Sequence, residues 1–386
     1  MLRGLGGLVG AALLVGGGSG CAARTGGVSA GSARGTAVKE AAPAPVPPGA
    51  FPGERPDRPL HRYEFRRPEM GVPFRIVLYA WNPALAKVAA DEAFRRVEAL
   101  NALLSDYEFD SELTRLSQTA GSGRWVAVSP ELWRVLAYAQ SLARETRGAY
   151  DITVGPAITL WRKARRVHEL PPPEVLAEAR AAIGWEKLRL DPAGHRALLT
   201  APRMKLDLGS VAKGFALDEA LKALEARGIH RALLAGGGDL RASGPPPDQT
   251  GWRIELAPLD APDAPPPAFL RLAHGALATS GDLFQHVEIN GVRYSHIVDP
   301  RTALGLTDHS LVTVLAPTGM EADSLATAVS VLGPEAGLKL IARRPGVEAQ
   351  ITRRPGAKLE IHRSPGFAAR LEPAAPPPAG KPSGKK

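Results

Sequence analysis

The segment "KLDLGSVAKG", residues 205–214, places Asp207 and Lys213 six positions apart on either side of a Gly-Ser turn. Apolar and polar residues alternate before Asp207, which predicts a strand ending there; Gly209 permits a sharp turn, and Ser210 is a typical helix N-cap. Free N–H groups at a helix start attract anions, and Lys213 adds a full positive charge one turn into that helix. The segment is therefore a candidate phosphate site. A carboxylate offsetting the helix dipole and a solvated lysine would explain the same residues.

A second pair of oxygen ligands occurs in "MEADSLATAVSVLG", where Asp323 and Thr327 are four residues apart. On a helix this spacing puts both side chains on one face, here among small and apolar neighbours. An acid and a hydroxyl suit a hard cation such as Mg²⁺, which takes one or two protein ligands together with phosphate. The alternative is structural: Thr327 bonds back to its own helix, and Asp323 lies in the first turn as a cap-like acid.

Two further segments carry side chains that suit chemistry. In "YSHIVDPRTALG", His296 precedes an Asp-Pro turn, where it serves either as an acid or base or as a packing residue. In "RGAYDITVGP", Tyr150 and Asp151 follow a glycine turn and suit stacking on, and hydrogen bonding to, a flat heterocycle.

Several common chemistries have no support in the sequence. We find no GxxxxGK[ST] phosphate loop, no GxGxxG after a strand, no HExxH, no paired CxxC and no GxSxG. The net charge is +9, but the segment Leu338–Lys386 alone holds eleven Lys/Arg against three Asp/Glu. The basic character therefore belongs to the C-terminal segment, and a nucleic-acid partner is not expected.

These residues need helices and strands to position them, and the pattern predicts both without a regular βα alternation. An α+β fold is therefore favoured over a doubly wound sheet. Asn82 and Pro83 predict the start of a helix with an apolar face that includes Val88, and Asp218 and Lys222 predict an i,i+4 pair on the helix that Gly228 ends. The predicted helices cover 83–104, 130–147, 171–184, 211–227 and 319–341; the predicted strands lie within 72–80, 185–209, 230–244, 251–259, 268–281, 284–300 and 310–317.

The N-terminus is typical of an exported protein. Arg3 precedes an apolar run that is too short to span a bilayer, so we expect residues 1–21 to be an export signal. Cys21, the only cysteine of the chain, follows this run as in a lipoprotein, although Gly18 stands where leucine is usual. Lipidation of Cys21 is the interpretation that we favour, and simple signal cleavage is the alternative. With one cysteine, no intramolecular disulfide can form.

Composition divides the rest of the chain. Residues 22–60 are rich in Pro, Ala and Gly and are predicted to be a disordered tether. Residues 61–362 are expected to form one catalytic body, interrupted by a proline-rich insertion at 258–268. Residues 363–386 are expected to be a disordered, basic, proline-rich tail.

Eight motifs, taken in order, resemble the ApbE family of FAD:protein FMN transferases. They are "MGVPF", "LSDYEFDSELTRLSQ", "RGAYDITVGP", "KLDLGSVAKGFALDEA", "LLAGGGDLRASG", "ATSGD", "YSHIVDPRTALG" and "EADSLATAVSVLG", within residues 63–345. The resemblance implies a single large body related to the T-fold, with mixed or antiparallel sheets and flanking helices. It also implies Mg²⁺-dependent transfer of the FMN phosphoryl moiety from FAD to a Ser or Thr hydroxyl of a target protein, with release of AMP.

The resemblance also implies roles for particular residues. Asp323 and His296 are the candidate catalytic residues, and the metal would be held by Ser210, Asp323 and Thr327. Val72 replaces the threonine of the family's MGT triplet and has no hydroxyl to offer. The implied flavin contacts are Met70, Tyr107, Ala149, Tyr150, Asp151, Asp207, Lys213 and Ile297.

Three functions remain open on the sequence. The first is a flavin transferase, anchored in the cell envelope by a lipid, facing the periplasm and modifying a membrane respiratory flavoprotein. The second is a Mg²⁺-dependent hydrolase that cleaves FAD to FMN and AMP, with water in place of the acceptor. The third is a flavin-binding lipoprotein without catalysis, against which Asp323 and Thr327 argue because storage needs no metal.

Overall fold

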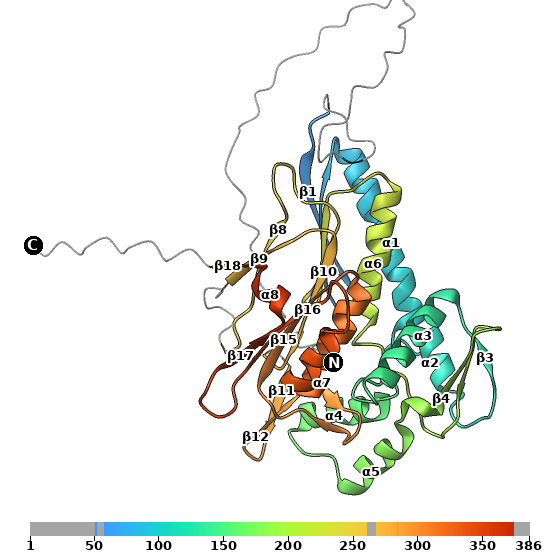
Figure 1. Cartoon of the computed structure of the whole chain (residues 1–386). Helices are drawn as coiled ribbons and strands as arrows, with labels where there is room; N and C mark the ends of the chain where they lie inside the picture. The colour runs from blue at the N-terminus through green and yellow to red at the C-terminus, as the bar shows by residue number, and fades with distance from the viewer. Residues whose placement is uncertain (1–50, 52–57, 261–267, 284, 374–386) are drawn as a thin grey trace, which may run out of the picture.

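The computed structural model describes residues 51, 58–260, 268–283 and 285–373 (Figure 1). The predicted export signal, Cys21, most of the tether and the last residues of the tail lie outside this range. Among the described residues, no helix is both long and apolar enough to cross a lipid bilayer.

One large antiparallel sheet forms the centre of the body. Its eight strands lie in the order β1-β2-β6-β7-β10-β15-β16-β17, and each neighbouring pair is antiparallel. Their bounds are β1 His61–Glu69, β2 Val72–Ala80, β6 Ala232–Gly236, β7 Asp239–Ala242, β10 Gly275–Gly281, β15 Ser310–Ala316, β16 Glu348–Arg353 and β17 Glu360–Arg363.

Helices pack on one face of this sheet, and a small second sheet packs on the other (Figure 1). The strand β2 shows why: Ile76 and Leu78 belong to the cluster under the helices, whereas Val77 between them packs with Trp252 and Leu270 of the second sheet. The helices that contact the first face are α1 Pro83–Leu104, α6 Ala212–Ala226 and α7 Gly319–Ile341. The other helices are α2 Glu112–Ser117, α3 Pro130–Glu145, α4 Gly155–Val167, α5 Pro173–Ala182 and α8 Pro365–Ala368, of which α8 packs through Phe367 with the second sheet. The second sheet has the order β18-β9-β8, formed by Leu371–Pro373, Ala268–Leu272 and Trp252–Glu255.

Three small sheets complete the described fold. The sheet β3-β5-β4 (Val126–Ala127, Arg196–Leu199 and Leu188–Asp191) lies beside α3, near the one-turn 3-10 helix Trp185–Lys187. The hairpin β11-β12 (His286–Ile289 and Val292–Ser295) follows β10 and leads directly into His296. The pair β13-β14 (Val298–Asp299 and Leu304–Gly305) encloses the Asp-Pro turn.

The crossing of α6 and α7 positions the candidate site. Gly214 lies on α6 and Gly319 at the start of α7, and the two backbones touch there. Asp218, one turn further along α6, accepts hydrogen bonds from the Gly319 and Met320 N–H groups at 2.8 and 2.9 Å, so it caps α7. Lys213 and Asp323 flank this contact, and the crossing therefore places them together.

The α+β class and the antiparallel sheet are as predicted, and so is the cap of α1, where the Asn82 side chain accepts the Leu85 N–H. Val88 does not belong to the buried face of α1, because 48% of it is exposed. The helices α2 and α4 were not expected. At the C-terminal end, α8 and β18 extend the body beyond residue 362 to Pro373.

The segment before α6 also differs from the prediction. In place of a strand ending at Asp207, Lys205 forms one isolated parallel bridge with Val154. The N-cap position of α6 is Val211, and the Ser210 hydroxyl donates to Tyr150 Oη instead of accepting an N–H of the helix. Asp218 does not pair with Lys222, because it binds Arg241 and caps α7, while Lys222 pairs with Glu219.

Candidate functional site

Lys213 lies between two buried carboxylates at the crossing of α6 and α7. Its Nζ is 3.2 Å from Asp239 Oδ2 and 3.3 Å from Asp323 Oδ2, and it donates to Gly209 O at 3.0 Å. Asp323 is only 3% exposed, and its Oδ2 also accepts the Gly214 N–H at 3.1 Å. The two motifs that the sequence analysis singled out therefore meet at one point.

The charges at this point decide the protonation of the lysine. Burial alone would lower the pKa of Lys213, but the charges of Asp239 and Asp323 outweigh burial and raise the pKa above its usual value. The ammonium is thus positively charged throughout the physiological range. Burial, together with the charge of Asp323, raises the pKa of Asp239.

Asp239 is a site residue that the sequence analysis did not identify. It follows the three glycines of "LLAGGGDLRASG" and begins β7 beside α6, so the β6–β7 turn brings it to Lys213. The glycine run before an acid was the available signal; it lies inside the segment 230–244, which was predicted as one strand and forms the two strands β6 and β7. It does not by itself show which basic residue the acid meets.

Asp207 is held by a second ion-pair system on the other side of the Gly-Ser turn. Its Oδ1 accepts the Gly209 N–H at 2.8 Å, and its Oδ2 accepts from Arg162 at 2.9 Å. Arg162 also binds Asp106 and stacks over the Tyr107 ring, with its guanidinium carbon 4.1 Å from the ring centroid. Burial, and then the charge of Asp106, raises the pKa of Asp207, and Arg162 opposes this rise. Arg162 lies on the unexpected helix α4 and was also missed from sequence.

The Tyr150 and Ser210 hydroxyls meet beneath this turn. Ser210 Oγ donates to Tyr150 Oη at 3.3 Å, and burial raises the pKa of Tyr150 well above its usual value. Ala149, the preceding residue, packs with Ile297 in one buried cluster. Asp151 points back to its own turn, accepting from the Thr153 N–H and hydroxyl at 2.8 Å, and burial raises its pKa to about 6.

Thr327 and the β1–β2 turn lie at two borders of the site. Thr327 lies on α7 one helical turn after Asp323, and its Oγ1 is 3.5 Å from Ser280 Oγ of β10. Met70 and Gly71 form a two-residue hairpin turn with φ of 48° and 75°, as a primed turn requires. A Cβ at Gly237 would lie 3.3 Å from Val72 and 3.2 Å from Lys213, so this turn comes close to the lysine side chain.

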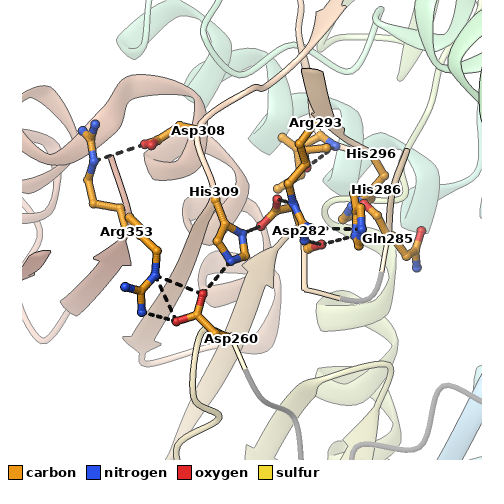
Figure 2. Close-up of polar contacts among 12 residues, drawn as sticks. Asp260, Asp282, Gln285, His286, Arg293, His296, Asp308, His309 and Arg353 are labelled. Carbon is orange, nitrogen blue, oxygen red and sulfur yellow. Dashed lines mark hydrogen bonds and ion pairs between the residues drawn. The ribbon is translucent and has the colours of Figure 1, made fainter. Parts of the chain in front are cut away.

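His296 has a defined hydrogen-bonding state. Its Nδ1 lies 3.1 Å from Gln285 O, and since a carbonyl only accepts, Nδ1 carries the proton and Nε2 is left as the basic nitrogen of the neutral ring (Figure 2). Burial lowers the pKa of His296 to about 4, and the nearby positive charges of Arg165 and Lys213 act in the same direction. No direct contact links His296 to Asp323 in the structure.

The oxygen donors of the site suit a hard cation. In the part of the chain that the structure describes, no three His, Cys, Asp or Glu side chains converge as a metal site. A cation at Asp323 would therefore have to be completed by hydroxyl oxygens such as those of Thr327 and Ser210, and by oxygens of a substrate. That incomplete set is typical of Mg²⁺ bound together with phosphate.

Comparison with known proteins gives one consistent result. Residues 70–351 match the ApbE family. The chain is 35% identical over 261 residues to an FAD:protein FMN transferase of Haemophilus influenzae, covering 65% of this chain and 75% of that protein. It is 34% identical over 287 residues to the FAD:protein FMN transferase of Vibrio cholerae, covering 73% and 85%.

Solved structures agree with the sequence comparison. The flavin transferase ApbE from Vibrio cholerae superposes with a TM-score of 0.72 at 30% identity, covering 81% of this chain and all of that one. The apo flavinyl transferase ApbE of Pseudomonas stutzeri gives a TM-score of 0.70 at 28% identity, covering 81% and 97%.

Proposed function

The chain belongs to the ApbE family and is an FAD:protein FMN transferase, and from this premise we propose how its residues carry out the transfer. The observation that carries the proposal is the meeting of Lys213 with Asp323 beside the 207–210 turn. A charged ammonium and an acid that can bind a cation are what a diphosphate requires.

The diphosphate of FAD would lie against the start of α6. There the Lys213 ammonium and the positive end of the α6 dipole would attract negative charge. Asp323, Thr327 and Ser210 would hold Mg²⁺, which supplies charge neutralisation at the phosphoryl oxygens. With a cation held at Asp323, Lys213 would keep its contacts with Asp239 and Gly209 O and would have one N–H donor left for the phosphate.

The flavin half of the substrate would extend toward Tyr107 and the cluster of Ala149 and Ile297. The Tyr107 ring is 76% exposed and held on its other face by Arg162, so it offers a fixed flat surface for an isoalloxazine ring. Asp207, kept in place by Arg162 and Gly209, offers an acceptor to the N–H groups of the ligand.

The transfer itself needs an acceptor hydroxyl and a base. The hydroxyl oxygen of a Ser or Thr on the target protein attacks the FMN-side phosphorus, the bond from this phosphorus to the bridging oxygen breaks, and AMP leaves. The hydroxyl proton passes to a base, for which we propose Nε2 of His296, because that nitrogen is unprotonated and its partner nitrogen is fixed by Gln285 O.

The location and the acceptor follow from the N-terminal segment and from the reaction. Export followed by lipidation at Cys21 would place the enzyme on the outer side of a bacterial membrane. The acceptor would then be a respiratory flavoprotein of that membrane with an exposed Ser or Thr target motif.

The experiment is a comparison of AMP release with and without an acceptor. Purified protein, FAD and Mg²⁺ are incubated alone, then with a flavoprotein domain that carries the target motif, and then with its Ser/Thr→Ala variant. We expect AMP and covalent flavin fluorescence only with the intact acceptor. AMP in all three samples would show a hydrolase, and bound FAD without AMP in any would show a flavin-binding protein.

A further inference from the structure

Asp282, at the end of β10, is the centre of a buried polar cluster beside the hairpin β11-β12 (Figure 2). The residue is only 2% exposed. Its Oδ2 accepts from Arg293 of β12, and its Oδ1 accepts from His309 Nδ1 at 2.7 Å. Its carbonyl oxygen also accepts from Arg293 and from His286 Nδ1, both at 2.8 Å.

The cluster continues to the neighbouring strands. His309 Nε2 lies 3.1 Å from Asp260 Oδ1, so the imidazole lies between two carboxylates. Asp260 in turn binds Arg354, the residue after β16. Asp282 thus ties the hairpin to the ends of three interior strands of the large sheet: to β10 directly, to β15 through the preceding His309, and to β16 through His309, Asp260 and Arg354.

The hairpin needs such a tie because it does not belong to the large sheet. Among the described strands, its two strands pair only with each other. Its apolar contacts come from Val287, Ile289 and Tyr294, which pack beside Trp161 of α4. Its polar face, with His286 and Arg293, is held by Asp282.

The base of this hairpin orients His296. Gln285 lies just before β11. Its backbone carbonyl oxygen accepts two hydrogen bonds from His296, one from the backbone N–H at 3.0 Å and one from Nδ1 at 3.1 Å. A shift of the hairpin relative to β10 would move Gln285 O and with it the imidazole. A displacement of about 1 Å at a reacting group can cost about 10²-fold in rate.

We propose that Asp282 is a positioning residue for His296: held between Arg293 and His309, its carboxylate fixes the hairpin whose base orients the imidazole. This proposal rests on the proposed role of His296 in the transfer. Asp282 itself touches neither substrate nor reacting atoms. The cluster thus extends the site, with the hairpin β11-β12 lying between Asp282 and the proposed base His296 in the chain.

The test compares Asp282→Asn, Arg293→Ala and Arg293→Lys with the wild-type protein. Glu372→Gln is the matched control, because Glu372 binds Arg271 at 2.7 Å in an equivalent carboxylate pair on the second sheet. The readouts are kcat and KM for FAD, the melting temperature, and the imidazole ¹⁵N signals of His296, assigned by loss of the signal in His296→Gln. The NMR readout does not depend on catalysis.

We expect Asp282→Asn and Arg293→Ala to lower kcat at least about tenfold with KM for FAD nearly unchanged, and to convert the single Nδ1–H signal into a mixture of tautomers. Arg293→Lys should recover part of both, and Glu372→Gln should change neither. A lower melting temperature with unchanged kcat and an unchanged His296 signal would overturn the proposal. If His296→Gln is fully active, the role of His296 in the transfer is wrong, and the NMR signal still decides whether Asp282 orients it.

Discussion

Gly214 and Gly319 are in backbone contact where α6 crosses α7. A Cβ at Gly214 would lie 2.1 Å from Gly319 O, and a Cβ at Gly319 would lie 2.4 Å from Gly214 O. Neither position can accept a side chain without separating the helices. Because Lys213 and Asp323 flank this contact, the distance between them depends on the two glycines.

Replacement of Gly214 should therefore damage the site as well as the fold. We expect Gly214→Ala to lower the free energy of unfolding by about 1–3 kcal/mol, as overpacking does, and to weaken FAD binding by increasing the separation of Lys213 and Asp323. Urea denaturation and titration of FAD fluorescence measure the two effects. Gly194→Ala is the control, because a Cβ there meets only the flexible Arg196 side chain. Equal behaviour of the two variants would contradict the account.

Asp323 should be needed for the cation and not for folding. We expect Asp323→Ala to lose turnover by at least about 10²-fold, and its lost hydrogen bonds to cost about 1–3 kcal/mol of stability. In the presence of FAD, Mg²⁺ at a hundred times its own Kd should stabilise the wild-type protein by about 2.7 kcal/mol. This should appear as a higher melting temperature for the wild type and as no change for the variant. Unchanged AMP release by the variant at saturating Mg²⁺ would count against the metal assignment.

The sequence predicted most of the fold because its apolar periods are strong. Asn82 with Pro83 predicted α1, and alternation at Phe74, Ile76 and Leu78 predicted β2. The helix α4 was missed, since the second half of "GPAITLWRKARRV" is dominated by basic residues and its packing depends on Trp161, which is buried against distant residues. Likewise, nothing local shows that Asp218 caps another helix.

For the site, the motifs identified Lys213 and Asp323 but not the residues that surround and position the site. Asp239, Arg162 and Asp282 act through partners far away in sequence: the residue numbers differ by 26 to 45 in the pairs Asp239–Lys213, Arg162–Asp207 and Asp282–His309. Local spacing carries no information on such pairs. The three-dimensional fold was needed to find them.

The pH dependence of activity should reveal the lowered pKa of His296. With its folded pKa near 4 and an ordinary value of 6.5, the ring stays neutral as pH falls from 7 to about 5. The activity should therefore not decline through pH 6.5 on account of this residue, and it should fall only as pH approaches 4. Between pH 6.5 and 4 the unfolded chain binds the additional proton, so stability falls with falling pH. Profiles of kcat/KM and urea unfolding, compared with His296→Gln, measure both. An acid limb at pH 6.5 that the variant lacks would refute the assignment.

Cys21 should determine how the protein associates with membranes. We expect Cys21→Ser to move the protein from the membrane fraction to the supernatant. Cys21 is the only cysteine of the chain, so no other thiol can carry the lipid. Fractionation followed by mass spectrometry of the N-terminus measures this. Continued membrane association of the variant would favour an uncleaved signal or binding by the basic C-terminal segment.

Phe51 packs its ring against His230, at a centroid distance of 5.7 Å, and occupies the space that a side chain at residue 244 would fill. With an anchor at Cys21, this contact shortens the connection to the membrane, because only the 29 residues 22–50 lie between the lipidated residue and Phe51. A fully extended chain of that length spans at most about 100 Å. The length of this connection would limit how far the body can move from the bilayer. The contact of Phe51 would therefore limit which membrane proteins can bring an acceptor hydroxyl to the enzyme.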